Sequence, residues 1–387
     1  MKKIIVFACL ATTIFFACKK NKVDNSQVTD ADKKEVIVNH ANIVLASYED
    51  SYNLVLNLQT KINTFITNPT DANLEGCKTA WKASRVVYNQ TDAYRFSDGP
   101  IDHENGPEGL MNGWPMDEQF IDYVKGDATS GIINNPKTYP NITPEVLENL
   151  NENGGETNIA TGYHAIEFLL WGQDLSALTA GQRPYTDYVI GANGTNANQN
   201  RRALYLKAAV GLLISNFEYL INQWKLGGVY RTKFTSQMPA DSALTSIVRS
   251  IGSLTKGELA NERMAVALTN QDQEDEHSCF SDNTHIDVQY NFIGIQNVYM
   301  GKYVRTNGEV VQGKSLSDLI TKKDANKNNL VLAQFSDAKA KLFAIQAPFD
   351  QEIILTAGRE RVSAAINSCR TLADKIADAA FALGIKN

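Results

Sequence analysis

The chain has few of the residues from which compact metal and redox motifs are built. Its 387 residues include only five cysteines and five histidines. No two cysteines have the Cys-x-x-Cys spacing of a zinc or redox motif. The His-Glu-x-x-His helix of many zinc peptidases is also absent. Any metal site must therefore draw its ligands from distant segments.

Disulfides can contribute little to this chain. Cys9 falls in an N-terminal segment that we expect to be removed, and Cys18 is a candidate for lipidation. The remaining three, Cys77, Cys279 and Cys369, are far apart in the sequence. One disulfide is compatible with an oxidising envelope, but an odd count leaves at least one free thiol. We expect these three to be small buried residues.

Long apolar runs and basic stripes are both missing from the body of the chain. After residue 17 no segment approaches 18 uninterrupted apolar residues, whereas a membrane-spanning helix needs about 20. The chain has 37 Lys and Arg against 43 Asp and Glu, a formal net charge of −6. Without a basic stripe to neutralise phosphates, a nucleic-acid partner is excluded.

The N-terminus has the features of a secretory signal. Met1-Lys2-Lys3 precedes an apolar run that ends at Ala17. Residues 15–18, Phe-Phe-Ala-Cys, resemble a lipobox, in which Cys18 becomes the lipidated N-terminus. We therefore predict a signal peptide over 1–17, a lipidated tether over 18–35, and a bacterial envelope protein held on the membrane by its lipid, facing the periplasm or the surface. The alternative is an ordinary signal with an incidental cysteine.

Helical periodicity dominates the rest of the chain. Apolar residues recur at three-to-four spacing, whereas strand signals are limited to a short hairpin around Asn307-Gly308. Asp324 or the asparagine run before Leu330 is the expected N-cap of the penultimate helix, and Asp350 that of the short helix near Ile353. The predicted helical segments are 37–65, 74–94, 159–171, 201–224, 242–253, 258–268, 286–299, 329–346 and 359–383.

The length and spacing of these helices predict two bundles. A chain this long is large for a single core, and residues 227–239 form the least helical stretch suitable for a boundary. We predict an all-α fold with an N-terminal helical lobe over 36–226 and a C-terminal helical lobe over 240–387, each of about four helices. The long irregular segment 98–155 should lie over their junction.

One apolar segment carries a histidine and a carboxylate three residues apart. In residues 161–174, Thr-Gly-Tyr-His-Ala-Ile-Glu-Phe-Leu-Leu-Trp-Gly-Gln-Asp, His164 and Glu167 would share one helix face. Such a pair can bind a divalent metal ion, relay a proton, or satisfy itself as a buried hydrogen bond. The third possibility gives the pair only a structural role, in which each group satisfies the other because an unpaired buried imidazole or carboxylate is costly.

Several blocks of the sequence resemble the imelysin family of bacterial envelope proteins, which is also catalogued as a metallopeptidase family. The Gly-x-His-x-x-Glu segment and the Trp-Gly-Gln-Asp that follows it resemble that family's signature, and the block 274–285 resembles its iron-regulated branch. The resemblance implies a helical fold of two bundles and a role in iron acquisition. The other matching blocks are Trp81, Arg85 and Tyr88, then 94–102, 112–118, 121–124 and 299–303.

The matching blocks supply the candidate site residues. His164 and Glu167 are too few to hold a metal ion, so further ligands must come from elsewhere, with His277 and His285 as imidazoles and Glu274, Asp282 or Asp102 as carboxylates. The candidate metal ligands are His164, Glu167 and His277. The candidate ligand-binding residues are Arg85, Tyr88, Asp102, His277, Ser281 and Asp282.

The sequence thus predicts an envelope lipoprotein that binds a metal ion or small polar ligand between two helical lobes. Iron is the expected divalent metal and zinc the less favoured one. Other iron-uptake proteins of the envelope are the expected partners. A metal-dependent peptidase is the alternative, although no complete catalytic zinc set is visible. A further alternative is an interaction protein without catalysis.

Overall fold

A computed structural model describes residues 27–385. The fold is all-helical apart from one short hairpin, as the periodicity predicted. The signal peptide and Cys18 lie outside the described residues. Helix α1 begins at Asp30, within the segment predicted as a tether, because Thr29 and Asp32 form a capping box at that point.

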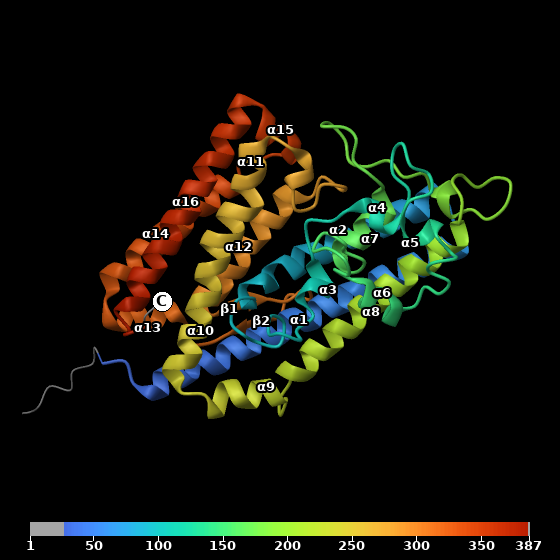
Figure 1. Ribbon diagram of the computed structural model, residues 1–387. Coiled ribbons are helices and arrows are strands. Elements are labelled where there is room, and N and C mark those ends of the chain that lie inside the picture. The colour runs from blue at the N-terminus through green and yellow to red at the C-terminus, as the bar shows by residue number, and fades with distance from the viewer. Residues whose placement is uncertain (1–26, 386–387) are drawn as a thin grey trace, which may run out of the picture.

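Four helices make the N-terminal lobe. The long helix α1 packs against α2 and α8, and the short helix α7 fits between α2 and α8. In Figure 1 these helices run side by side from blue to yellow-green. Their bounds are Asp30–Thr67 for α1, Asp71–Thr91 for α2, Gly162–Trp171 for α7 and Gln199–Trp224 for α8.

The C-terminal lobe is a second helical bundle. Its helices pack on one another, and α12 also lies along α2 of the first lobe. The bounds are Ala240–Ser253 for α10, Leu254–Val266 for the π-helix η4, Ala267–Asn270 for α11, Thr284–Met300 for α12, Leu316–Lys323 for α13, Ala325–Leu342 for α14, Phe349–Ile354 for α15 and Thr356–Phe381 for α16.

The π-helix η4 is a departure from the sequence prediction. The two helices expected over 242–253 and 258–268 form one continuous run, in which η4 joins α10 to α11. A helix widened in this way shifts the direction of its side chains, and such segments often mark functional sites.

The remaining elements are short. Segment 98–155 holds four of them, and residues 227–239, expected to be the least helical stretch, contain a helix and a π-helical turn. The bounds are Asp92–Tyr94 for η1, Glu108–Asn112 for α3, Glu118–Ile121 for α4, Gly131–Asn134 for α5, Pro144–Leu150 for α6, Tyr185–Tyr188 for η2, Val229–Thr232 for α9, Lys233–Gln237 for η3 and Gln273–Asp275 for η5.

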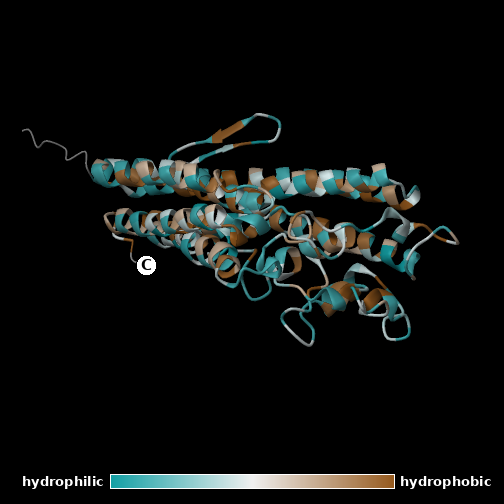
Figure 2. Cartoon of the chain, turned by 90° about the horizontal axis from the view of Figure 1, so that it is seen from above, coloured by the Kyte–Doolittle hydropathy of each residue, from teal (hydrophilic) through white to brown (hydrophobic). Residues whose placement is uncertain are grey.

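The predicted hairpin is present beside α1. Strands β1 (Lys302–Val304) and β2 (Val310–Gln312) are antiparallel, with Tyr303 opposite Val311. Figure 2 shows the hairpin on the outer side of α1, with apolar residues on its strands.

The two predicted caps have different outcomes. The Asp324 carboxylate accepts hydrogen bonds from the backbone N–H groups of Asn326 and Lys327, and so caps α14 as expected. Asp350 does not cap α15: it lies inside the first turn of that helix, and Pro348 occupies the N-cap position.

One helical stretch meets the length and composition of a membrane span. Among the described residues it is Gln199–Gln237, and 56% of its apolar window is buried within the protein. Because α8 packs against α1 and α7, this apolar character is also what a core helix needs.

Candidate functional site

Helix α7 holds His164 and Glu167 in the interior, where neither side chain is exposed to solvent. Nδ1 of His164 lies 2.9 Å from Oε2 of Glu167. Oε1 of Glu167 accepts two hydrogen bonds from Ser281, one from its N–H (3.0 Å) and one from its hydroxyl (2.6 Å). Ser281 lies in the loop between η5 and α12, so this carboxylate joins the two lobes.

The backbone at Gly162 explains why the motif begins with a glycine. Its φ is +83°, and a Cβ at this position would lie 2.6 Å from the carbonyl oxygen of Met111 in α3. Only glycine fits this conformation and this approach. The close contact between α3 and the start of α7 brings the segment around Asn112 next to His164.

His277 belongs to a second buried network. Its Nδ1 lies 2.7 Å from Oδ2 of Asp287, and Nη2 of Arg85 donates to the same oxygen at 2.9 Å. Arg85 also donates from Nη1 to Oδ1 of Asn112 at 2.6 Å. Nε2 of His277 is 3.4 Å from Nδ2 of Asn112. The network thus ties α2, α3 and α12 to the loop that carries His277.

The two histidines, hereafter the histidine pair, are direct neighbours. The ring centroids of His164 and His277 are 4.7 Å apart at an interplanar angle of 71°, and the Trp114 ring is 5.1 Å from that of His164. In each histidine Nδ1 contacts a carboxylate. Nε2 of His164 has no hydrogen-bond partner among the described residues. A carboxylate behind Nδ1 is the usual arrangement for a histidine that binds a metal ion through Nε2.

Burial controls the protonation of these groups. It lowers the pKa of His277 to about 4, helped by the positive Arg263 and opposed by Asp287. Burial, with His277 nearby, holds the pKa of His164 well below its usual value, so both imidazoles are neutral at pH 7. Burial also raises the pKa of Glu167 to about 8, against the hydrogen bonds from Ser281.

Asp287 is the permanent negative charge of the site. Burial favours its neutral form, but the guanidinium of Arg85 and the contact with His277 outweigh burial and hold its pKa well below the usual range. Asp287 therefore faces Arg85 as a carboxylate, in a pair with no solvent exposure on either side chain.

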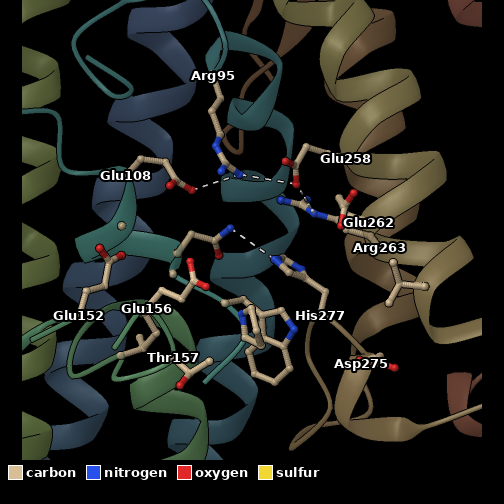
Figure 3. A pocket seen from close by; sticks show the side chains of 17 residues that line it. Arg95, Glu108, Glu152, Glu156, Thr157, Glu258, Glu262, Arg263, Asp275 and His277 are labelled. Carbon is tan, nitrogen blue, oxygen red and sulfur yellow. Dashed lines mark hydrogen bonds and ion pairs between the residues drawn. The ribbon is translucent and has the colours of Figure 1, made fainter. Parts of the chain in front are cut away.

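A pocket of about 680 Å³ opens beside the histidine pair, between the two lobes. We call it the inter-lobe pocket. Figure 3 shows carboxylates from both lobes around it, with Arg95 pointing between Glu108 and Glu258. Six carboxylates face two guanidinium groups, so the lining is acidic overall. The charged and histidine residues of its lining are Arg95, Glu108, Glu152, Glu156, Glu258, Glu262, Arg263, Asp275 and His277.

The structure separates the sequence-predicted residues into three groups. His164, Glu167, His277, Ser281 and Arg85 come together in the networks described above. Tyr88 is fully buried and packs on Tyr163, 4.6 Å between ring centroids, outside the pocket lining.

Asp102 and Asp282 lie elsewhere. The Asp102 carboxylate accepts hydrogen bonds from the backbone N–H groups of Asp98 and Gly99. Asp282 points toward Asp174 and Asp350 instead of the histidine pair. Within residues 27–385, those three aspartates are the single group of three or more candidate ligands close enough to share an ion. The histidine pair thus has no third protein ligand among the described residues.

Asp287, Asn112 and the glutamates of η4 were not anticipated from the sequence. Asp287 lies ten residues after His277 with α12 starting between them, so no helical spacing links the two. Glu258 and Glu262 are four residues apart and would be judged an ordinary solvated face.

Most of the chain resembles known proteins in sequence and fold. The family model described as Imelysin matches residues 44–376. The chain belongs to the imelysin family. The iron-regulated protein A of Synechococcus elongatus is 24% identical over 375 residues, covering 94% of this chain and 88% of that protein.

Solved structures of the family have the same fold. A crystal structure described as an iron-regulated protein A precursor from Parabacteroides distasonis has a TM-score of 0.69 at 18% identity, over 92% of this chain and 96% of that one. An imelysin-like protein from Psychrobacter arcticum has a TM-score of 0.64 at 11% identity, over 93% and 98%.

Proposed function

We propose that this imelysin-family chain is an envelope protein of iron acquisition that binds iron, alone or in a small complex, between its two lobes. The observation that carries the proposal is the histidine pair, two neutral imidazoles in contact, each with the carboxyl group of an acidic residue behind Nδ1. The name of the Synechococcus relative, iron-regulated protein A, supports the choice of metal.

The protein supplies only part of a coordination sphere. Two imidazoles bind divalent iron, zinc and copper with little discrimination by themselves. Because residues 27–385 place no third candidate side chain beside the histidine pair, the remaining ligands would come from water or from the bound complex. An incomplete sphere suits cargo that is received and passed on better than a permanently held ion.

The acidic lining serves the capture of a cation. Arg95 and Arg263 are paired with Glu108, Glu258 and Asp92. Glu152, Glu156 and Glu262 are exposed and form no ion pair among the described residues. The negative electrostatic potential of these three glutamates raises the local concentration of cations in the pocket and disfavours the binding of anionic chelates.

Attachment by lipid at Cys18 completes the proposal. The basic start, apolar run and Ala17-Cys18 junction favour an envelope protein held at a membrane, with other iron-uptake proteins as partners. Mass spectrometry of the mature N-terminus tests this part separately. An unmodified N-terminus at another residue would contradict it.

Iron binding tests the central claim. Protein purified without oxygen is titrated with Fe(II), and the iron bound per chain is measured. Excess calcium is present to occupy sites made of carboxylates alone. We expect about one iron per chain, with at least tenfold weaker binding in His164→Gln and His277→Gln. His103→Ala is the matched control, because His103 lies outside the pocket lining. Equal binding by all four proteins, or none by the wild type, would overturn the proposal.

A further inference from the structure

A second group of acidic side chains lies where the loop after α7 and the residues just before α12 come close to α15. One carboxylate oxygen from each of Asp174, Asp282 and Asp350 lies within 4.8 Å of the others. Glu276 lies beside them, with its carboxyl group against that of Asp350. We call these four residues the carboxylate cluster.

Most oxygens of the carboxylate cluster lack a hydrogen-bond partner among the described residues. Six of them have no hydrogen bond within the part of the chain that the structure describes: Oδ2 of Asp174, Oδ1 of Asp282, and both oxygens of Glu276 and Asp350. Three of the four residues are buried, with exposed fractions of 3% for Asp174, 1% for Asp350 and 0% for Glu276. Buried polar groups are nearly always satisfied, so this number of unpaired oxygens in one place points to a bound group.

No basic side chain neutralises the cluster. None of its four carboxylates forms an ion pair with Lys or Arg within residues 27–385. Lys82 acts on Asp282 only from a distance, and its ammonium lies over the Trp171 ring, 5.7 Å from the centroid. Without a cation, protons must hold the cluster together, and burial does raise the pKa of Asp174 to about 7 and that of Asp282 to about 6.

We propose that the carboxylate cluster is a binding site for a hard divalent cation, calcium in particular. Calcium binds six to eight oxygens at about 2.3–2.6 Å, which permits oxygens up to about 5 Å apart. The spacing of Asp174, Asp282 and Asp350 falls within this limit. All donors are carboxylate oxygens, whereas zinc and copper favour nitrogen or sulfur.

The cation would connect three separate segments. Asp174 lies in the loop after α7, Asp282 just before α12, and Asp350 in α15. Ser281, the residue before Asp282, holds Glu167. A cation would therefore fix the loop that carries His277 and Ser281, and would couple the C-terminal lobe to α7. This site is separate from the histidine pair, and its proposal stands whether or not iron binds there.

Calcium titration of the full-length mature chain tests the inference. By calorimetry after chelation, we expect one calcium per chain with a Kd below about 1 mM. Five millimolar calcium should raise the Tm by several degrees, because only the folded state binds the ion. Asp350→Asn and Asp174→Asn should weaken binding at least tenfold, while the exposed Asp374→Asn should bind like the wild type.

The stability of the variants, measured without and with calcium, provides a second test. Without calcium, Asp350→Asn should be at least as stable as the wild type, since it removes one of four crowded acids. With calcium this order should reverse. No binding up to 10 mM calcium, equal binding by the Asp350 and Asp374 variants, or a response confined to Fe(II) would overturn the proposal and leave a cluster held by shared protons.

Discussion

Ser281 donates both its backbone N–H and its hydroxyl to a single oxygen of Glu167, 114 residues earlier in the chain. The contact joins the two lobes in the interior, where both residues are fully buried. It leaves the other oxygen of Glu167 to orient the His164 ring. The loop before α12 therefore decides how the histidine of α7 is presented.

Ser281→Ala should destabilise the protein by about 1–3 kcal/mol, since a buried carboxyl oxygen loses a hydrogen bond. Urea unfolding measures this loss. Ser336→Ala is the control: Ser336 is exposed, and its hydroxyl bonds only its own helix. A loss below about 0.5 kcal/mol for Ser281→Ala would show that the contact contributes no stability.

Arg85→Met should be strongly destabilising, by about 3–5 kcal/mol, because it leaves Asp287 as an uncompensated buried charge. Adding Asp287→Asn should recover much of this loss. A double-mutant cycle by chemical unfolding gives the coupling energy. The exposed Lys256–Asp374 pair should show less than about 1 kcal/mol in the same cycle. Additive effects of the Arg85 and Asp287 substitutions would contradict the pairing.

Gly162→Ala should cost at least about 2 kcal/mol, because alanine must adopt φ +83° with its Cβ against the Met111 carbonyl. Gly252→Ala is a matched control within α10, where an added Cβ meets nothing within 4 Å. It should stabilise the protein by about 0.5–1 kcal/mol. Thermal unfolding of both variants measures these changes in stability. Losses of similar size in Gly162→Ala and Gly252→Ala would refute the steric explanation.

His40 should make the protein less stable in mild acid. It is buried among the rings of Tyr94, Trp224 and Phe234, and burial lowers its pKa to about 3. As the pH falls below about 6.5, His40 becomes protonated in the unfolded chain but stays neutral in the folded protein until the pH reaches the pKa of the folded state. The contribution of neutral His40 to the free energy of unfolding is thus fully present above pH 6.5 and is lost between about pH 6.5 and 3.

His40→Leu should remove that dependence. Between pH 6 and 4, the free energy of unfolding of the wild type should fall faster than that of the variant by about 1.4 kcal/mol per pH unit. Urea unfolding at several pH values measures both slopes. Parallel slopes would mean that His40 takes up its proton in the folded protein as well.

Local patterns in the sequence were sufficient for the helices and several of their ends. Three-to-four periodicity depends only on neighbouring residues, so α1, α2, α7, α8, α12, α14 and α16 follow from it. The Asp324 cap and the hairpin at Asn307-Gly308 are local in the same sense. The blocks around His164 and 274–285 were also enough to predict the family.

The tertiary structure alone decided which side chains meet. Asp287 faces His277 and Arg85 because α12 lies along α2, and the glutamates of the π-helix η4 line the pocket opposite residues of the N-terminal lobe. Asp350, which the sequence suggested as a cap, is buried beside Asp174 and Asp282 instead. Hydrophobic periodicity determines which face of each helix is buried, but the pairing of buried polar groups depends on the packing of helices distant in sequence.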